Sequence, residues 1–148
     1  MIKLKIMAGF SLKENIVPVE YKKLRHNGGV FAIGDVVVWD RTSDAYDVTT
    51  HALSNATTLN LCGISMEATT SSSTTVLVAL IAPDQKWSCE SANAANTSHN
   101  GLRVGLTDAN TVNNDGSDGT STSDLFMQTG VAGTEVVGRF IIPGQVTA

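Results

Sequence analysis

The sequence predicts an all-β protein, a single antiparallel β-barrel or sandwich of about eight short strands with an extended N-terminal arm. Three observations favour this class. Thr and Ser occupy 30 of the 148 positions and Pro only three, a composition that suits half-buried pleated surfaces better than helices. Aromatic residues make up 5% of the chain, so the core must come mainly from Val, Ile, Leu and Ala. Short apolar segments alternate with turn residues along most of the chain.

The chain divides into a basic arm, residues 1–25, and an acidic domain, residues 26–148, which is long enough for one compact core. The arm carries six cations against two acids, a net charge of +4, whereas the domain carries four cations against twelve acids, a net charge of −8. We therefore expect the arm to dock on an acidic neighbour, such as the domain of an identical subunit. The alternative is an exposed edge that its charges keep soluble. The cations of the arm are Lys3, Lys5, Lys13, Lys22, Lys23 and Arg25.

The arm is expected to be extended rather than helical. Residues 1–7 (MIKLKIM) alternate apolar and lysine side chains, the period of a strand with one covered and one solvated face. In residues 11–25, Pro18 lies between two β-branched residues, which limits any helix to a single turn. Residues 26–29 (HNGG) then interrupt the chain with glycines.

The domain is expected to be a succession of short strands. Residues 75–83 (TVLVALIAP) are the most apolar window and have no polar face, which predicts a strand covered on both sides. The alternation in residues 86–91 (KWSCES) puts Trp87 and Cys89 on one side. The expected strands cover residues 29–40, with a turn or bulge at Gly34 and Asp35, and residues 45–50, 59–68, 75–83, 86–91, 102–107, 125–129 and 135–143.

Residues 108–124 (DANTVNNDGSDGTSTSD) are predicted to form a long surface loop. Val112 is its single large apolar side chain, and loops of this length usually bind something or are mobile. Its Asp and Asn oxygens suit calcium, but the spacing around Gly116 and Gly119 does not fit an EF-hand. Turn formation is the preferred interpretation, and a calcium or glycan contact is the alternative.

The sequence contains no recognisable catalytic pattern. His26, His51 and His99 stand in polar, turn-like settings without metal-ligand spacing, so we expect them at the surface. Cys62 and Cys89 are expected to be buried free thiols, with a disulfide between neighbouring strands as the alternative. The chain lacks the G-x-S-x-G, S-x-x-K, G-x-G-x-x-G and P-loop motifs. We therefore expect no enzyme activity, no cofactor and no bound metal.

Nucleic acid and membranes are disfavoured as partners. The cations of the arm are spread over 25 residues without an aromatic stacking platform, and the acidic domain would repel phosphate. No run approaches eighteen apolar residues, and the first ten residues lack the apolar stretch and cleavage site of a secretory signal. The protein is thus expected to be made in the cytoplasm.

Two tryptophans are candidates for partner binding. Trp39 and Trp87 each lie near the end of an apolar strand and are followed by polar residues. We expect them to be anchors in the core or at a subunit interface, and the alternative is a rim position where a ring stacks on a sugar.

The order of these segments resembles the small β-barrel decoration (cement) proteins of tailed-phage heads. In that family G-D-V-V leads into a strand, a G-I-x-x-E-A strand follows, and an apolar strand ends near a proline before a partly polar segment. The resemblance covers residues 29–142. The strings that carry it are residues 34–38 (GDVVV), 61–68 (LCGISMEA), 76–83 (VLVALIAP), Trp87 and residues 137–140 (VGRF).

The resemblance implies a structural function in a virion. Such subunits, often trimeric, bind the outer surface of the capsid and stabilise joints between capsomers. The expected partners are therefore a major capsid protein and further copies of this chain as a homotrimer, and the expected location is the capsid exterior. The alternative from another class is a carbohydrate-binding β-sandwich module or virion adhesin that uses Trp39, Trp87 and the loop of residues 108–124.

Overall fold

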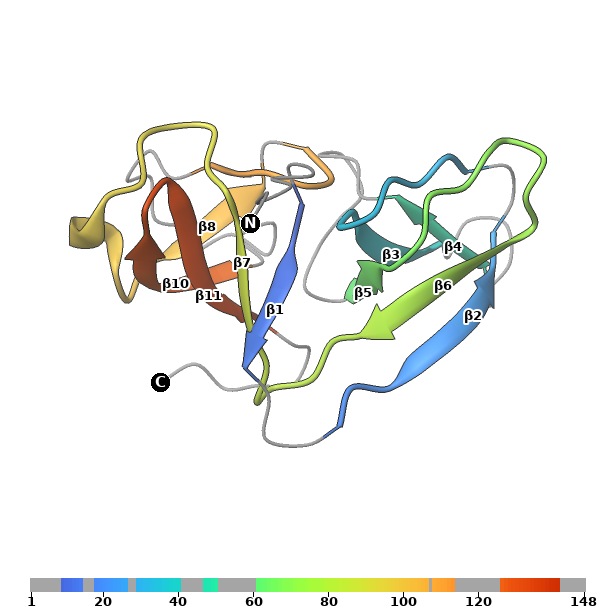
Figure 1. Cartoon of the computed structure of the whole chain (residues 1–148), viewed down its shortest axis with the longest axis horizontal. Helices are drawn as coiled ribbons and strands as arrows, with labels where there is room; N and C mark the ends of the chain where they lie inside the picture. Colours follow the sequence, from blue (N-terminus) through green and yellow to red (C-terminus); the bar gives the residue numbers. More distant parts are fainter. Residues whose placement is uncertain are drawn as a thin grey trace, which may run out of the picture.

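A computed structural model of the chain describes residues 9–14, 18–26, 29–40, 47–50, 61–106, 108–113 and 126–141 (Figure 1). The described residues form the strands β1 (Ser11–Glu14), β2 (Tyr21–Arg25), β3 (Val36–Asp40), β4 (Asp47–Thr50), β5 (Leu61–Ser65), β6 (Thr75–Leu80), β7 (Lys86–Glu90), β8 (Arg103–Leu106), β9 (Val112–Asn113), β10 (Phe126–Ala132) and β11 (Glu135–Phe140), with the short 3-10 helix η1 (Thr97–His99). Each strand expected between residues 29 and 143 has a counterpart, so the predicted all-β class is confirmed.

The strands form two antiparallel sheets. Sheet A has the order β1-β7-β11-β10-β8-β9, and sheet B has the order β2-β6-β5-β3-β4. Figure 1 shows sheet A on the left and sheet B on the right, and the chain passes from one to the other between β6 and β7. Of the two expected architectures the protein adopts the sandwich, and the expectation of a β-barrel over residues 26–148 is wrong because the two sheets do not form one closed barrel.

The main core lies between the sheets. Sheet A contributes the fully buried Trp87 and Phe126, and sheet B contributes Val36 and Ile64. Phe10 inserts between them, and its ring centroid lies 5.4 Å from that of Phe126. Phe10, Trp87, Phe126 and Phe140 thus gather where the two sheets meet, and each buries a large apolar area.

A second core covers the opposite face of sheet B. Val76 and Val78 of β6 belong to this second cluster, whereas Ala79 belongs to the main core. The prediction that residues 75–83 form a strand covered on both sides is thus confirmed for β6. Sheet B also curls, because a parallel bridge between His26 and Val48 joins the end of β2 to β4 at the opposite edge.

Two glycines permit close packing of backbones within the sheets. A Cβ at Gly63 would overlap the carbonyl oxygen of Ala79 in the paired strand β6, and a Cβ at Gly138 would overlap that of Met127 in β10. Glycine within a strand often marks such an approach. Gly63 belongs to the GI-x-x-EA string, so this part of the resemblance has a packing explanation.

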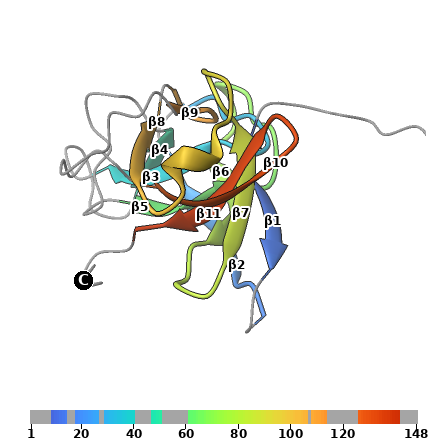
Figure 2. The same ribbon diagram turned by 90° about the vertical axis from the view of Figure 1, so that its left-hand side faces the viewer.

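The described residues of the N-terminal segment are strands of the two sheets. β1 pairs with β7 at the edge of sheet A, and β2 pairs with β6 at the edge of sheet B. Figure 2, viewed from the sheet A end, shows β1 beside β7. Residues 11–14 and 21–25 are thus extended, as expected, but they are edge strands of the domain's own sheets and not a separate arm. Residues 1–8 lie outside the described part.

Buried residues test three of the expectations. Cys62 lies in the second core and Cys89 in the main core, and both are free thiols, as predicted. His26 was expected at the surface, but it is 4% exposed because it ends β2 underneath the loop of residues 29–31. Val112, expected in a long loop, is buried because β9 pairs with β8. Within the described part, no helix has the length and hydropathy needed to cross a bilayer.

Candidate partner-binding surface

The candidate surface is the outer edge of β2, where three of the predicted cations lie. Lys22, Lys23 and Arg25 are exposed on this strand, and Lys13 is exposed on β1, the edge strand of the other sheet. We call Tyr21–Arg25 the basic edge. Lys3 and Lys5, the remaining cations of the predicted set, lie outside the described residues.

The register of β2 shows which of its backbone groups face outward. The N–H of Leu80 donates to the carbonyl of Glu20 (2.9 Å), and the N–H of His26 donates to the carbonyl of Thr74 (3.0 Å). Because antiparallel partners alternate between bonded and non-bonded pairs, even-numbered residues of β2 turn their backbone groups toward β6. The N–H and C=O groups of Tyr21 and Lys23 therefore point away from β6, and no described strand pairs with them there.

Two ion pairs lie along this edge, and both are open to solvent. Lys22 Nζ lies 3.7 Å from Glu20 Oε1, with both side chains more than half exposed. Lys23 Nζ lies 3.7 Å from Glu67 Oε1. Such exposed pairs contribute about 0–1 kcal/mol each, so the lysines can exchange these partners for an acidic group on another molecule.

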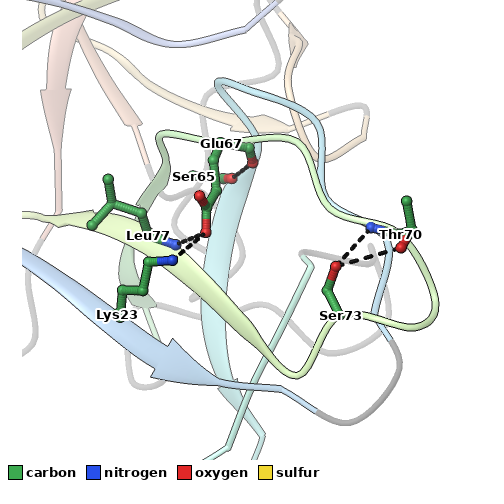
Figure 3. Close-up of polar contacts among 6 residues, drawn as sticks. All are labelled: Lys23, Ser65, Glu67, Thr70, Ser73 and Leu77. Carbon is green, nitrogen blue, oxygen red and sulfur yellow. Dashed lines mark hydrogen bonds and ion pairs between the residues drawn. The ribbon is translucent and has the colours of Figure 1, made fainter.

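Glu67 anchors the loop that flanks the basic edge (Figure 3). Its Oε1 accepts a hydrogen bond from the backbone N–H of Leu77 (2.8 Å) and faces Lys23, while Ser65 Oγ donates to its carbonyl (2.7 Å). Ser73 Oγ then accepts from the N–H of Thr70 (3.2 Å). The Ser/Thr-rich loop of residues 69–75 is therefore held beside β2 by local side-chain bonds.

Tyr21 is a candidate that the sequence analysis did not select. It begins the basic edge and is 53% exposed, although its neighbour across the pair, Ala79, is buried. Tyrosine is enriched in the residues that dominate binding interfaces because its ring buries a large area while its hydroxyl keeps a polar partner. Its local sequence offers no signal for exposure, which follows from the position of β2 at the sheet edge.

The tryptophans do not join this surface. Trp87 is 1% exposed in the main core, its Nε1 donates to Gln85 Oε1 (3.2 Å), and its ring centroid lies 6.3 Å from that of Phe140. Trp87 is thus a core anchor, one of the two positions expected for it, and is neither at a rim nor available to a partner on this surface. Trp39 is half-buried and packs against the second core. The two rings thus lie in different cores and do not form a common stacking platform.

The first residues of the predicted acidic loop serve turns. Asp108 Oδ1 accepts from the N–H of Asn110 (2.9 Å), and Asn110 Nδ2 donates to Asp35 Oδ1 (3.0 Å). The other oxygen of Asp35 accepts from the N–H of Ala32 (2.8 Å). Asp35 of the GDVVV string therefore joins two loops between the sheets, and residues 114–124 of the predicted loop lie outside the described part.

Acid–base and metal chemistry have little support in the described part of the chain. It contains no group of three or more His, Cys, Asp or Glu residues positioned to hold a metal ion. Burial raises the pKa of the Cys62 thiol to about 12 and also raises that of Cys89, so neither supplies a thiolate near neutral pH.

Comparison with known proteins adds no family assignment. No protein-family model matches the chain, and a search of curated proteins finds no significant relative.

Proposed function

We propose that this protein is a capsid decoration (cement) protein of a tailed-phage head, which binds the outer capsid surface, acts as a homotrimer and stabilises the joints between capsomers. The sequence resemblance over residues 29–142 supplies the class of partner. The basic edge, which offers three cations and outward backbone groups on a fixed strand, is the observation that supports binding. An acidic extended segment of a capsid protein would match both features by adding a strand to this edge.

The residues that carry the resemblance support a structural function. Asp35 joins two loops, Gly63 permits close strand packing, and Glu67 fixes the loop beside β2. A molecule whose distinctive residues maintain its shape is well suited to a task that depends on surface complementarity.

A capsid-binding assay tests this proposal. Heads purified without the protein are mixed with the full chain, and bound protein is measured after sedimentation. We expect the double variant Lys22→Glu and Lys23→Glu to bind at least about tenfold more weakly, with a shallower dependence on salt, because two attractive charges become repulsive. Arg139→Glu, an exposed charge reversal on β11 in sheet A, is the matched control and should bind within about twofold of the unchanged chain.

Two results would refute the proposal. One is the absence of the chain from purified virions of the phage that encodes it. The other is equal binding by the double variant and the Arg139→Glu control, which would exclude the basic edge. We do not propose the carbohydrate-binding alternative, because Trp87 is buried and only Trp39 remains of its two candidate rings.

A further inference from the structure

The turn that leads from η1 into β8 contains a chemically reactive dipeptide. Of the asparagines in the chain, only Asn27 and Asn100 are followed by glycine, and each also follows a histidine. Glycine has no side chain to hinder its backbone nitrogen, so this nitrogen can attack the amide of the preceding asparagine. Asn100 directly follows η1, the short coil at the far left of Figure 1, whereas Asn27 lies outside the described residues.

The reaction open to such a dipeptide is deamidation. The backbone nitrogen of Gly101 gives its proton to a base and bonds to the side-chain carbonyl carbon of Asn100, and the side-chain nitrogen leaves as ammonia. Water then opens the resulting succinimide ring. Cleavage of the new bond gives aspartate, whereas cleavage of the original peptide bond gives isoaspartate, whose backbone is longer by a methylene group. Water is the only reactant besides the chain, and nothing is oxidised or reduced.

In the folded protein Gln128 of β10 holds both of the groups that would have to react. The N–H of Gly101 donates to the backbone carbonyl of Gln128 (2.8 Å), and Gln128 Nε2 donates to Asn100 Oδ1 (2.8 Å). The nitrogen of Gly101 must lose the first bond before it can give up its proton, and the Asn100 side chain must lose the second before it can turn. The folded structure therefore opposes both requirements of the reaction.

The loop around Asn100 is tied to β10 by the same side chain. Gln128 Nε2 also donates to the carbonyl of Asn96 (2.8 Å), and the Gln128 side chain is fully buried. Within the loop, Asn96 Oδ1 accepts from the N–H of Ser98 (2.9 Å), and the N–H of Asn100 donates to the carbonyl of Thr97 (3.1 Å). One buried amide thus fixes both ends of the loop that carries the reactive dipeptide.

The backbone explains why a glycine follows Asn100. Gly101 has a φ of +88°, a conformation that residues with side chains rarely adopt. Any other residue would strain the turn into β8, although a Cβ at Gly101 would meet open space. The reactive dipeptide is therefore a consequence of the turn, and its protection must come from the contacts around it.

We propose that Asn100 and Gly101 form a deamidation site that Gln128 keeps unreactive in the folded protein. The reaction then proceeds only when this end of sheet A opens locally. Isoaspartate would lengthen the turn and displace the acceptor of Gln128 Nε2, so each event would weaken the loop irreversibly. This inference concerns the chemical ageing of the chain and holds whatever the protein binds.

Mass spectrometry of the full chain tests the protection. Trypsin releases residues 26–41 and 87–103, and each peptide contains one of the two Asn-Gly pairs. The chain is incubated at mildly alkaline pH, either folded or in enough urea to unfold it. In urea, Asn27 is the matched control and should react as fast as Asn100, because both lie between histidine and glycine. In the folded chain Asn100 should react at least about tenfold more slowly than in urea, and equal rates would overturn the proposal.

The variant Gln128→Met tests the role of the side chain. Methionine has a similar volume but cannot donate to Asn100, while the backbone bond to Gly101 is kept. We expect Asn100 to deamidate at least about threefold faster in this variant than in the unchanged chain, and within about twofold of the unchanged rate in Thr129→Ala, at the exposed neighbouring position. An unchanged rate in Gln128→Met would overturn the assignment.

Hydrogen exchange on the unchanged chain gives a second test if Gln128→Met does not fold, as judged by circular dichroism. The N–H of Gly101 should exchange at least about a hundredfold more slowly than in the unfolded chain, because it donates to a carbonyl of β10. Exchange at the unfolded rate would show that this N–H is free in the folded protein and would overturn the proposal.

Discussion

The two buried thiols should make the protein less stable as the pH rises above 9. In the unfolded chain each cysteine has a pKa near 9.0, whereas in the folded protein burial raises the pKa of Cys62 to about 12 and raises that of Cys89 as well. Above pH 9 the folded state therefore binds more protons than the unfolded state. Linkage then requires the free energy of unfolding to fall with pH, from the unfolded pKa up to the folded one.

The size of the effect follows from the unfolded pKa alone while the folded thiols stay protonated. At pH 10 about ten elevenths of each thiol is ionised in the unfolded chain, which favours unfolding by about 1.4 kcal/mol for each cysteine. The two together give about 3 kcal/mol between pH 8 and pH 10. This is a large fraction of the 5–15 kcal/mol that is typical of whole domains.

Urea unfolding at several pH values between 8 and 10.5, with a phosphine reductant present, measures how steeply the free energy of unfolding falls with pH. The double variant Cys62→Ala and Cys89→Ala will be less stable at every pH because it leaves cavities, but it lacks the thiol titration. All other groups are the same in the two proteins, so their contributions cancel in the comparison. Equal slopes for the two proteins would refute the reasoning, because they would mean that the buried thiols ionise as readily as in the unfolded chain.

Two substitutions test the packing and the loop anchor. Gly63→Ala should lower the free energy of unfolding by about 1–3 kcal/mol because the new methyl overlaps the backbone of β6, whereas Gly130→Ala, which has open space at its Cβ, should change it by less than about 1 kcal/mol. Glu67→Gln should cost less than about 1 kcal/mol, since it loses the charge opposite Lys23 but keeps an acceptor for the N–H of Leu77. Glu67→Ala should cost about 1–3 kcal/mol, because that N–H loses its acceptor. Denaturant titrations check both pairs, and equal stabilities within either pair would contradict the interpretation.

Local patterns in the sequence identify most strands of the domain, and β6 shows why. Val76, Val78 and Ala79 leave no polar face in this strand, and its two sides contact different cores. The spacing of apolar residues and the composition of a short window are therefore enough to predict a strand that is covered on both sides. The alternation in residues 86–91 likewise predicts that Trp87 and Cys89 share one side of their strand, and the structure shows that this side faces the main core.

The positions of the N-terminal strands could not be predicted in the same way. β1 and β2 pair with β7 and β6, strands at least fifty residues farther along the chain, and their own composition shows only that they are extended. The burial of His26 has the same origin. The bridge to Val48 brings β4 beside the end of β2, and the imidazole Nδ1 accepts from the N–H of Gly29 (3.0 Å). These are long-range contacts that no local window contains.

The candidate surface was predicted in part. The charge division of the sequence identified Lys22, Lys23 and Arg25, because charged side chains remain at the surface in almost any fold. Tyr21 was missed because an aromatic residue is exposed only when its position in the completed fold leaves it uncovered. Trp87 shows the converse, since the sequence alone did not decide between a core and an interface for its ring.

Because part of the predicted arm forms edge strands, a partner that binds there meets a smaller loss of backbone entropy. A free arm of 25 residues must lose backbone freedom when it binds, at a cost of about 1–2 kcal/mol for each residue that becomes fixed. In β2 the hydrogen bonds to β6 have already fixed the backbone, so a partner orders only the exposed side chains of Lys22, Lys23 and Arg25. The basic edge can therefore bind with a modest set of contacts.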